Sequence, residues 1–98
     1  MTDIVFEVVY KTERKIRLTS MQWKHVLKRH PYMNKYEEEI KETLKYPQKL
    51  VGPMKDLGYY YKYYKYLRSP NRYIFVLVKY LNGEGFVITT YQMENIKW

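Results

Sequence analysis

Residues 73–78, Tyr-Ile-Phe-Val-Leu-Val, constrain the fold more than any other segment because their odd-numbered and even-numbered positions are both apolar. Successive side chains of a strand point to opposite faces of the sheet, so this run predicts a central strand that is covered on both faces. Turn-forming residues flank it at 69–72 (Ser-Pro-Asn-Arg) and at 82–85 (Asn-Gly-Glu-Gly). They predict three antiparallel strands, at residues 58–67, 73–81 and 86–93.

The first half of the chain carries further strands and two helices. Residues 4–10 are rich in β-branched and aromatic side chains and predict a strand, and a second short strand is expected at 15–18. Thr19 or Ser20 can then cap a helix in which apolar residues recur at helical spacing until Pro31 ends it. A second helix is predicted at 34–46, followed by a strand at 49–54 that Gly52-Pro53 interrupts.

The order of these elements predicts an α+β fold in which two N-terminal helices pack on one face of a roughly four-stranded antiparallel sheet. The 98 residues suffice for one hydrophobic core, so we expect a single domain over residues 1–98. The chain contains no cysteine, which excludes thiol nucleophiles and cysteine-ligated metals. An acidic N-terminus without a long apolar run predicts a cytoplasmic protein that does not span a membrane.

The charge of the chain points to an anionic partner. Eighteen Lys and Arg residues against ten Asp and Glu give a net charge of +8. A basic surface attracts polyanions because binding releases counterions, so a nucleic acid is the first candidate. A composition rich in Lys, Tyr and Ile also arises in AT-rich genomes without selection for binding, and this alternative stays open.

The segment 23–31, Trp-Lys-His-Val-Leu-Lys-Arg-His-Pro, is the most informative one for chemistry. At about 100° per residue, Gln22, His25 and Arg29 share one arc of the predicted helix. An imidazole can transfer protons near neutral pH, and a guanidinium one turn away can hold a phosphate through two hydrogen bonds. This pair suits RNA cleavage through the 2′-hydroxyl, which requires a base, an acid and a cation but no metal. The alternative is a helix face that is merely exposed to solvent.

His30 lies on the apolar arc with Trp23, Val26 and Leu27, so a buried structural histidine at the helix end is its default interpretation. His25 and His30 are about 140° apart around a helix, which argues against a shared metal site. We therefore expect neither a metal nor a cofactor.

Residues 59–66 alternate Tyr and Lys densely. A base can stack on an exposed tyrosine while lysines neutralise the phosphate backbone. Tyrosine also packs well inside sheets, and the sequence does not show which face of this strand is buried. The candidates for nucleic-acid binding are Tyr60, Lys62 and Tyr64 of this strand, together with Lys24, Lys28 and Lys79.

Two polar groups elsewhere have structural alternatives. The last predicted strand carries Thr89, Thr90 and Tyr91, whose hydroxyls could hydrogen-bond a phosphate or a neighbouring strand. The acidic run at 37–39 lies at the start of the second predicted helix. There it complements the helix dipole, which favours a structural role over acid–base catalysis.

These segments together resemble a known family. The motif at 23–31, Tyr-Glu-Glu-Glu-Ile at 36–40, Pro47, the tyrosines at 59–61, the run 73–79 and Phe-Val-Ile-Thr-Thr-Tyr at 86–91 are similar to the small phage-associated nucleases of the barnase/EndoU/colicin/RelE-like superfamily. The resemblance covers roughly residues 18–97. It implies a metal-independent ribonuclease of the kind found in toxins and phage-encoded effectors. By position, it implies catalytic roles for His25, Arg29, His30, Thr89 and Tyr91.

Three functions are weighed on this basis. The first is an RNA endonuclease of toxin or mobile-element type, in which a sheet lysine such as Lys62 or Lys79 helps Arg29 to stabilise the phosphorane. Barnase-like enzymes carry a Glu and a His on the sheet that this chain lacks, so its second proton-transfer group is open. The second function is a non-catalytic module that binds nucleic acid. The third is an interaction protein paired with a small acidic antitoxin, and a homodimer through exposed strand edges is also open.

Overall fold

The computed structural model describes residues 3–10 and 14–96. Along the chain, the elements are β1 (Ile4–Val9), β2 (Lys15–Thr19), α1 (Ser20–Arg29), the 3-10 helix η1 (Pro31–Tyr36), α2 (Glu37–Lys45), β3 (Lys49–Met54), β4 (Leu57–Tyr63), β5 (Tyr73–Leu81) and β6 (Glu84–Met93). The six strands of this described part form one sheet with the order β1-β2-β6-β5-β4-β3. The apolar run at 73–78 lies in β5, inside the sheet between β4 and β6, which confirms the prediction of a central strand.

The expectation of a four-stranded antiparallel sheet is wrong, because the sheet has six strands and mixed pairing. β3 pairs with β4 at one edge of the sheet, and the β1–β2 hairpin extends the sheet on the other side. There β2 pairs with β6 in parallel through Ile16↔Gly85 and Arg17↔Phe86. Gly85 makes this close approach feasible, since a Cβ there would lie 2.9 Å from Val78 Cγ1 and 3.1 Å from Ile16 Cγ1. A parallel contact between segments so distant in the chain leaves no periodicity in the sequence.

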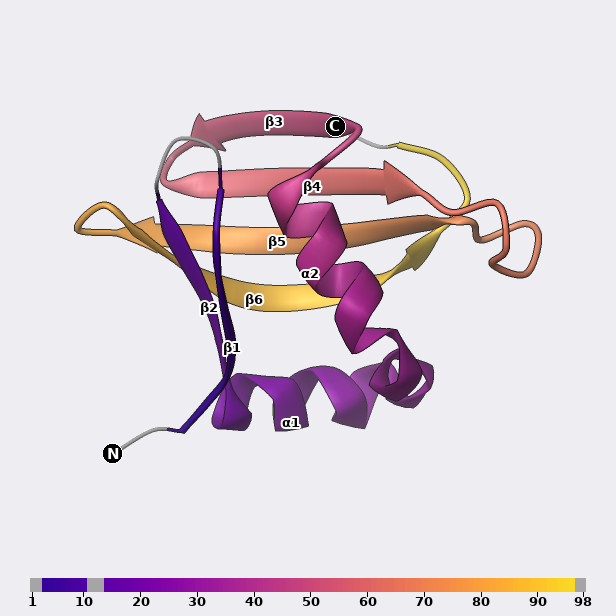
Figure 1. Cartoon of the computed structure of the whole chain (residues 1–98), viewed down its shortest axis with the longest axis horizontal. Coiled ribbons are helices and arrows are strands. Elements are labelled where there is room, and N and C mark those ends of the chain that lie inside the picture. Colours follow the sequence, from indigo (N-terminus) through magenta and orange to yellow (C-terminus); the bar gives the residue numbers. More distant parts are fainter. Residues whose placement is uncertain (1–2, 11–13, 97–98) are drawn as a thin grey trace.

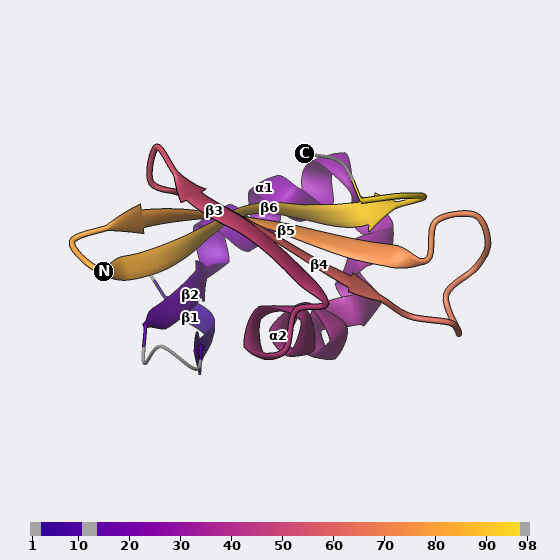
Figure 2. The same ribbon diagram turned by 90° about the horizontal axis from the view of Figure 1, so that it is seen from above.

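The expectation that both helices pack on one face of the sheet is also wrong, because α1 and α2 occupy different positions around it (Figure 1). α2 and the β1–β2 hairpin cover the same face, whereas α1 runs along the β6 edge (Figure 1). Figure 2 shows the sheet nearly edge-on, with α2 and the hairpin on one side of it. No helix among the described residues is long and apolar enough to cross a membrane. The core beneath α2 contains Leu18, Val26, Met33, Ile40, Leu44, Ile74, Val76 and Val78, each at most 2% exposed.

The helix boundaries follow local signals. Thr19 Oγ1 accepts a hydrogen bond from the Gln22 amide at 3.2 Å, so the predicted N-cap of α1 is confirmed. α1 ends at Arg29, and Pro31 begins η1. The helix predicted at 34–46 is divided between η1 and α2, because the chain first makes a tighter 3-10 turn that buries Met33.

β4 is shorter than predicted and ends at Tyr63. Tyr64 turns beneath α2 instead, where its hydroxyl donates to the Glu39 carbonyl at 2.9 Å and lies 3.0 Å from Thr43 Oγ1. Leu67 is also buried, so residues 64–72 form a loop that is packed at its start.

The hydrophobic cluster on the second face of the sheet is built from strand residues and from the segment after β6, and no helical residue in the described part of the chain belongs to it. Aromatic side chains cover this face, with ring centroids of Phe75 5.1 Å from both Tyr61 and Tyr91. Ile96, in the segment after β6, packs against this cluster.

Candidate functional site

A pocket of about 380 Å³ lies between α1 and β6. We call it the α1 pocket. It brings together all five residues that were predicted to be catalytic, although α1 and the His30 that follows it lie far from β6 in the sequence. Its lining consists of Gln22, His25, Val26, Arg29, His30, Ile88, Thr89 and Tyr91.

A β-bulge in β6 decides which hydroxyls reach the α1 pocket. Val87 pairs with Val78 and Thr89 pairs with Leu77, so Ile88 is an extra residue in β6. Beyond the bulge, Thr89 lines the pocket, whereas Thr90 is fully buried and donates to the Phe75 carbonyl at 2.8 Å. The structure therefore separates two adjacent threonines that looked equivalent in sequence.

Gln22 connects α1 to this bulge. Its side-chain amide donates a hydrogen bond to the carbonyl of Ile88, the bulged residue. Gln22 therefore fixes one end of the α1 pocket, although it was not predicted as a site residue. The sequence held a signal for it, because Gln22 shares a helix arc with His25 and Arg29.

His25 and Arg29 are exposed at the rim of the α1 pocket. Lys24 and Lys28 adjoin them, and these four residues line a further hollow on the outer side of α1. Within residues 3–10 and 14–96, Lys24, Lys28 and Arg29 form no ion pair with a carboxylate. Their positive charge is therefore available to an anionic ligand.

His30 is half-buried and makes two ring contacts. Its centroid lies 5.2 Å from that of Tyr91, and its Nδ1 lies 3.3 Å from the Tyr32 hydroxyl. No hydrogen bond between described residues engages its other nitrogen, Nε2. His30 is thus packed, as its structural interpretation expects, and it also lines the α1 pocket.

The residues predicted to bind nucleic acid from the sheet lie elsewhere. Tyr60 is 1% exposed and Tyr64 is 4% exposed, so no base can stack on either ring. Lys62 donates to the Tyr46 carbonyl at 3.1 Å, near the end of α2. Neither Lys62 nor Lys79 lines the α1 pocket, so the expected sheet lysine is missing from it. Among the residues that the structure describes, Arg29 is the only Lys or Arg that lines this pocket.

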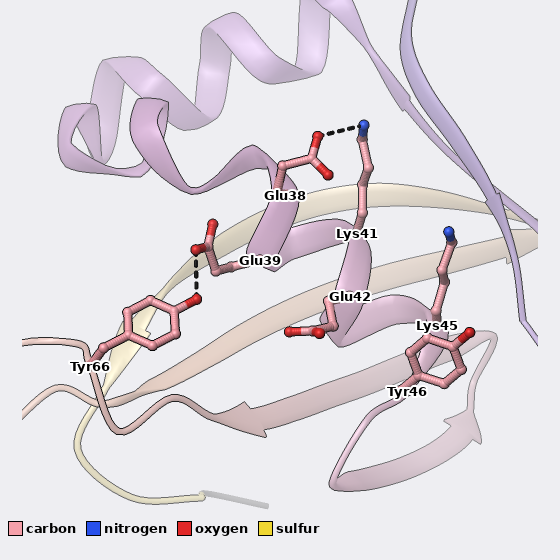
Figure 3. A pocket seen from close by; sticks show the side chains of 7 residues that line it. All are labelled: Glu38, Glu39, Lys41, Glu42, Lys45, Tyr46 and Tyr66. Carbon is pink, nitrogen blue, oxygen red and sulfur yellow. Dashed lines mark hydrogen bonds and ion pairs between the residues drawn. The ribbon is translucent and has the colours of Figure 1, made fainter.

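A second pocket, which we call the α2 pocket, differs from the α1 pocket because carboxylates line it together with lysines (Figure 3). Lys41 contacts Glu38 at 3.0 Å there, and the Tyr66 hydroxyl donates to Glu39 Oε2 at 2.6 Å. Burial and the adjacent Glu39 carboxylate raise the pKa of Tyr66 above its ordinary value. The α2 pocket also has a volume of about 380 Å³, and it is lined by Glu38, Glu39, Lys41, Glu42, Lys45, Tyr46 and Tyr66.

Within the part of the chain that the structure describes, no three His, Cys, Asp or Glu side chains form a group that could hold a metal ion. Comparisons of the chain with protein-family models, with curated proteins and with solved structures found no match. The interpretation of the α1 pocket therefore rests on the chemistry of its own residues.

Proposed function

We propose that this protein is a metal-independent endoribonuclease that cleaves RNA by attack of a 2′-hydroxyl on the adjacent phosphate. One observation carries the proposal: the α1 pocket combines two imidazoles, a guanidinium and two hydroxyls, and no carboxylate is among the described residues that line it. This set supplies the two proton-transfer groups and the cation that the reaction requires. The five groups belong to His25, His30, Arg29, Thr89 and Tyr91.

His25 and His30 divide the two proton transfers in this mechanism. One imidazole accepts the 2′-hydroxyl proton while the 2′-oxygen forms a bond to phosphorus. The other imidazolium donates a proton to the 5′-oxygen as the bond between phosphorus and that oxygen breaks. The products are a 2′,3′-cyclic phosphate and a 5′-hydroxyl. His30 thereby becomes the second proton-transfer group that the sequence left open.

Arg29 stabilises the negative charge that develops on the non-bridging oxygens of the phosphorane. A guanidinium can donate two parallel hydrogen bonds to the non-bridging oxygens, and this interaction strengthens as the phosphorane forms. Thr89 and Tyr91 add hydroxyl donors from the opposite wall of the pocket. Lys24 and Lys28 neutralise flanking phosphates from the outer side of α1.

The same proposal places the protein in the cytoplasm as an effector of toxin or mobile-element type. A small acidic antitoxin would complement the basic side of α1 and could cover the pocket.

Incubation of the purified protein with end-labelled RNA in EDTA tests the proposal. Wild-type protein should cleave, His25→Ala should cleave at least about 10²-fold more slowly, and Lys45→Ala in the α2 pocket should cleave like wild type. Failure of the wild type to cleave, or undiminished cleavage by His25→Ala, would reject it. Salt-dependent binding of RNA without any turnover would instead support a non-catalytic binding module, which the unpaired cations of α1 would also serve.

A further inference from the structure

A third pocket, of about 390 Å³, lies next to the α1 pocket. We call it the η1 pocket. The two meet at the contact between His30, which lines the α1 pocket, and Tyr32, which lines the η1 pocket. Three separate parts of the chain build it: η1, the loop between β4 and β5, and the end of β6. Its lining is Tyr32, Lys35, Tyr36, Arg68, Ser69, Asn71 and Gln92.

The η1 pocket has the composition of a nucleotide site. Lys35 and Arg68 bring positive charge to it from two elements, and neither forms an ion pair within the described residues. Tyr32 contributes an aromatic ring that is 44% exposed, which leaves room for stacking. In contrast with the α2 pocket, no carboxylate within residues 3–10 and 14–96 lines the η1 pocket.

Hydrogen bonds hold this arrangement together and leave groups for a ligand. The Gln92 side chain donates to the Asn71 carbonyl at 3.2 Å, which connects β6 to the loop. The side chains of Ser69 and Asn71 make no hydrogen bond with another described residue, and both line the pocket. They can donate and accept hydrogen bonds at the edge of a base.

We propose that the η1 pocket binds a nucleotide of single-stranded RNA beyond the two that share the scissile phosphate. Lys35 and Arg68 contact its phosphate, and its base stacks on Tyr32. A base must be unpaired and unstacked from its neighbours before it can stack on a tyrosine ring, so the ligand is a single strand and not a duplex. This inference rests on the proposed function, because it assigns the scissile phosphate to the α1 pocket.

Binding of DNA oligonucleotides, which lack the 2′-hydroxyl and are not cleaved, tests the inference separately from catalysis. Fluorescence anisotropy would compare a labelled dinucleotide with a labelled hexanucleotide. Wild-type protein should bind the hexamer about tenfold more tightly or better, since stacking and a phosphate contact are added. The double variant Lys35→Ala/Arg68→Ala should lose most of that gain, and so should Tyr32→Ala.

The matched control is Lys45→Ala/Lys65→Ala, which removes the same charge from exposed lysines outside the η1 pocket. Circular-dichroism melting curves would establish that every variant is folded. If both double variants lose hexamer affinity equally, the effect is one of net charge and the inference is overturned, even where wild-type protein cleaves RNA. If only the η1-pocket variants lose it while wild-type protein fails to cleave RNA, the subsite stands and the nuclease proposal fails.

Discussion

The α1 and α2 pockets have similar volumes but use their charged residues in opposite ways. In the α2 pocket, Lys41 is paired with Glu38, and Tyr66 donates to Glu39. In the α1 pocket, Arg29 has no carboxylate partner among the described residues. The acidic groups of α2 thus interact within the fold, whereas the cationic groups of α1 remain free for a ligand. A net charge of +8 alone would not have revealed this division.

The largest effect expected in the α1 pocket follows replacement of a histidine. His25→Ala and His30→Ala should each lower the cleavage rate about 10²- to 10⁴-fold, as expected for loss of a general acid or base. A substrate whose 5′-bridging oxygen is replaced by sulfur has a leaving group that needs no proton. One of the two variants should cleave this substrate at nearly the wild-type rate. The histidine that this variant lacks is then the general acid. Equal defects of both variants on both substrates would contradict the division of roles.

Replacement of Arg29 should have the next largest effect. Arg29→Ala should lower kcat about 10²- to 10³-fold, because the non-bridging oxygens lose the donor that stabilises their developing negative charge. Arg29→Lys should recover only a small part, since an ammonium does not form two parallel hydrogen bonds. If the lysine variant were fully active, Arg29 would act through its charge alone.

Tyr64→Phe tests the structural character of the α2 region. Loss of the hydrogen bond to the Glu39 carbonyl should lower the free energy of unfolding at neutral pH by about 1 kcal/mol and leave cleavage unchanged. Burial raises the pKa of Tyr64 above its ordinary value of 10.0. Its contribution to stability is therefore complete below pH 10 and declines above it, since the unfolded tyrosine ionises first.

Urea unfolding of wild type and Tyr64→Phe between pH 8 and 11 measures this effect. The stability difference between the two proteins should narrow as the pH rises above 10, because the phenylalanine variant has no hydroxyl to ionise. A difference that stays constant or widens would contradict the account.

The smallest effects concern Lys24 and Lys28. Each alanine replacement should weaken RNA binding only a few-fold and reduce the slope of log affinity against log salt by about 1. Lys45→Ala in the α2 pocket should leave the slope unchanged. Equal slope changes for all three lysines would show that net charge, and not the position of α1, governs binding.

The sequence predicted the elements whose signals are local. The apolar run at 73–78 identified the central strand, and Thr19 and Pro31 marked the ends of α1. The gathering of His25, Arg29 and His30 with two β6 residues could be expected only from the family resemblance. Their contact depends on where α1 meets β6.

The sequence did not predict the contacts between segments that are far apart in the chain. The parallel pairing of β2 with β6 depends on Gly85. Whether Thr89 or Thr90 lines the α1 pocket depends on the bulge at Ile88. The burial of Tyr60 and Tyr64 was equally hidden, because their strand carries tyrosine at both parities. These features are set by contacts between distant segments, which spacing along the chain does not encode.

The central claim is that the α1 pocket cleaves RNA through the 2′-hydroxyl. A DNA strand that contains a single ribonucleotide, incubated with the protein in EDTA, tests it most directly. The account predicts one cut, on the 3′ side of the ribonucleotide, that leaves a 2′,3′-cyclic phosphate. Two results would contradict the claim: wild-type protein leaves the strand uncut, or it cuts the strand only at deoxyribonucleotides.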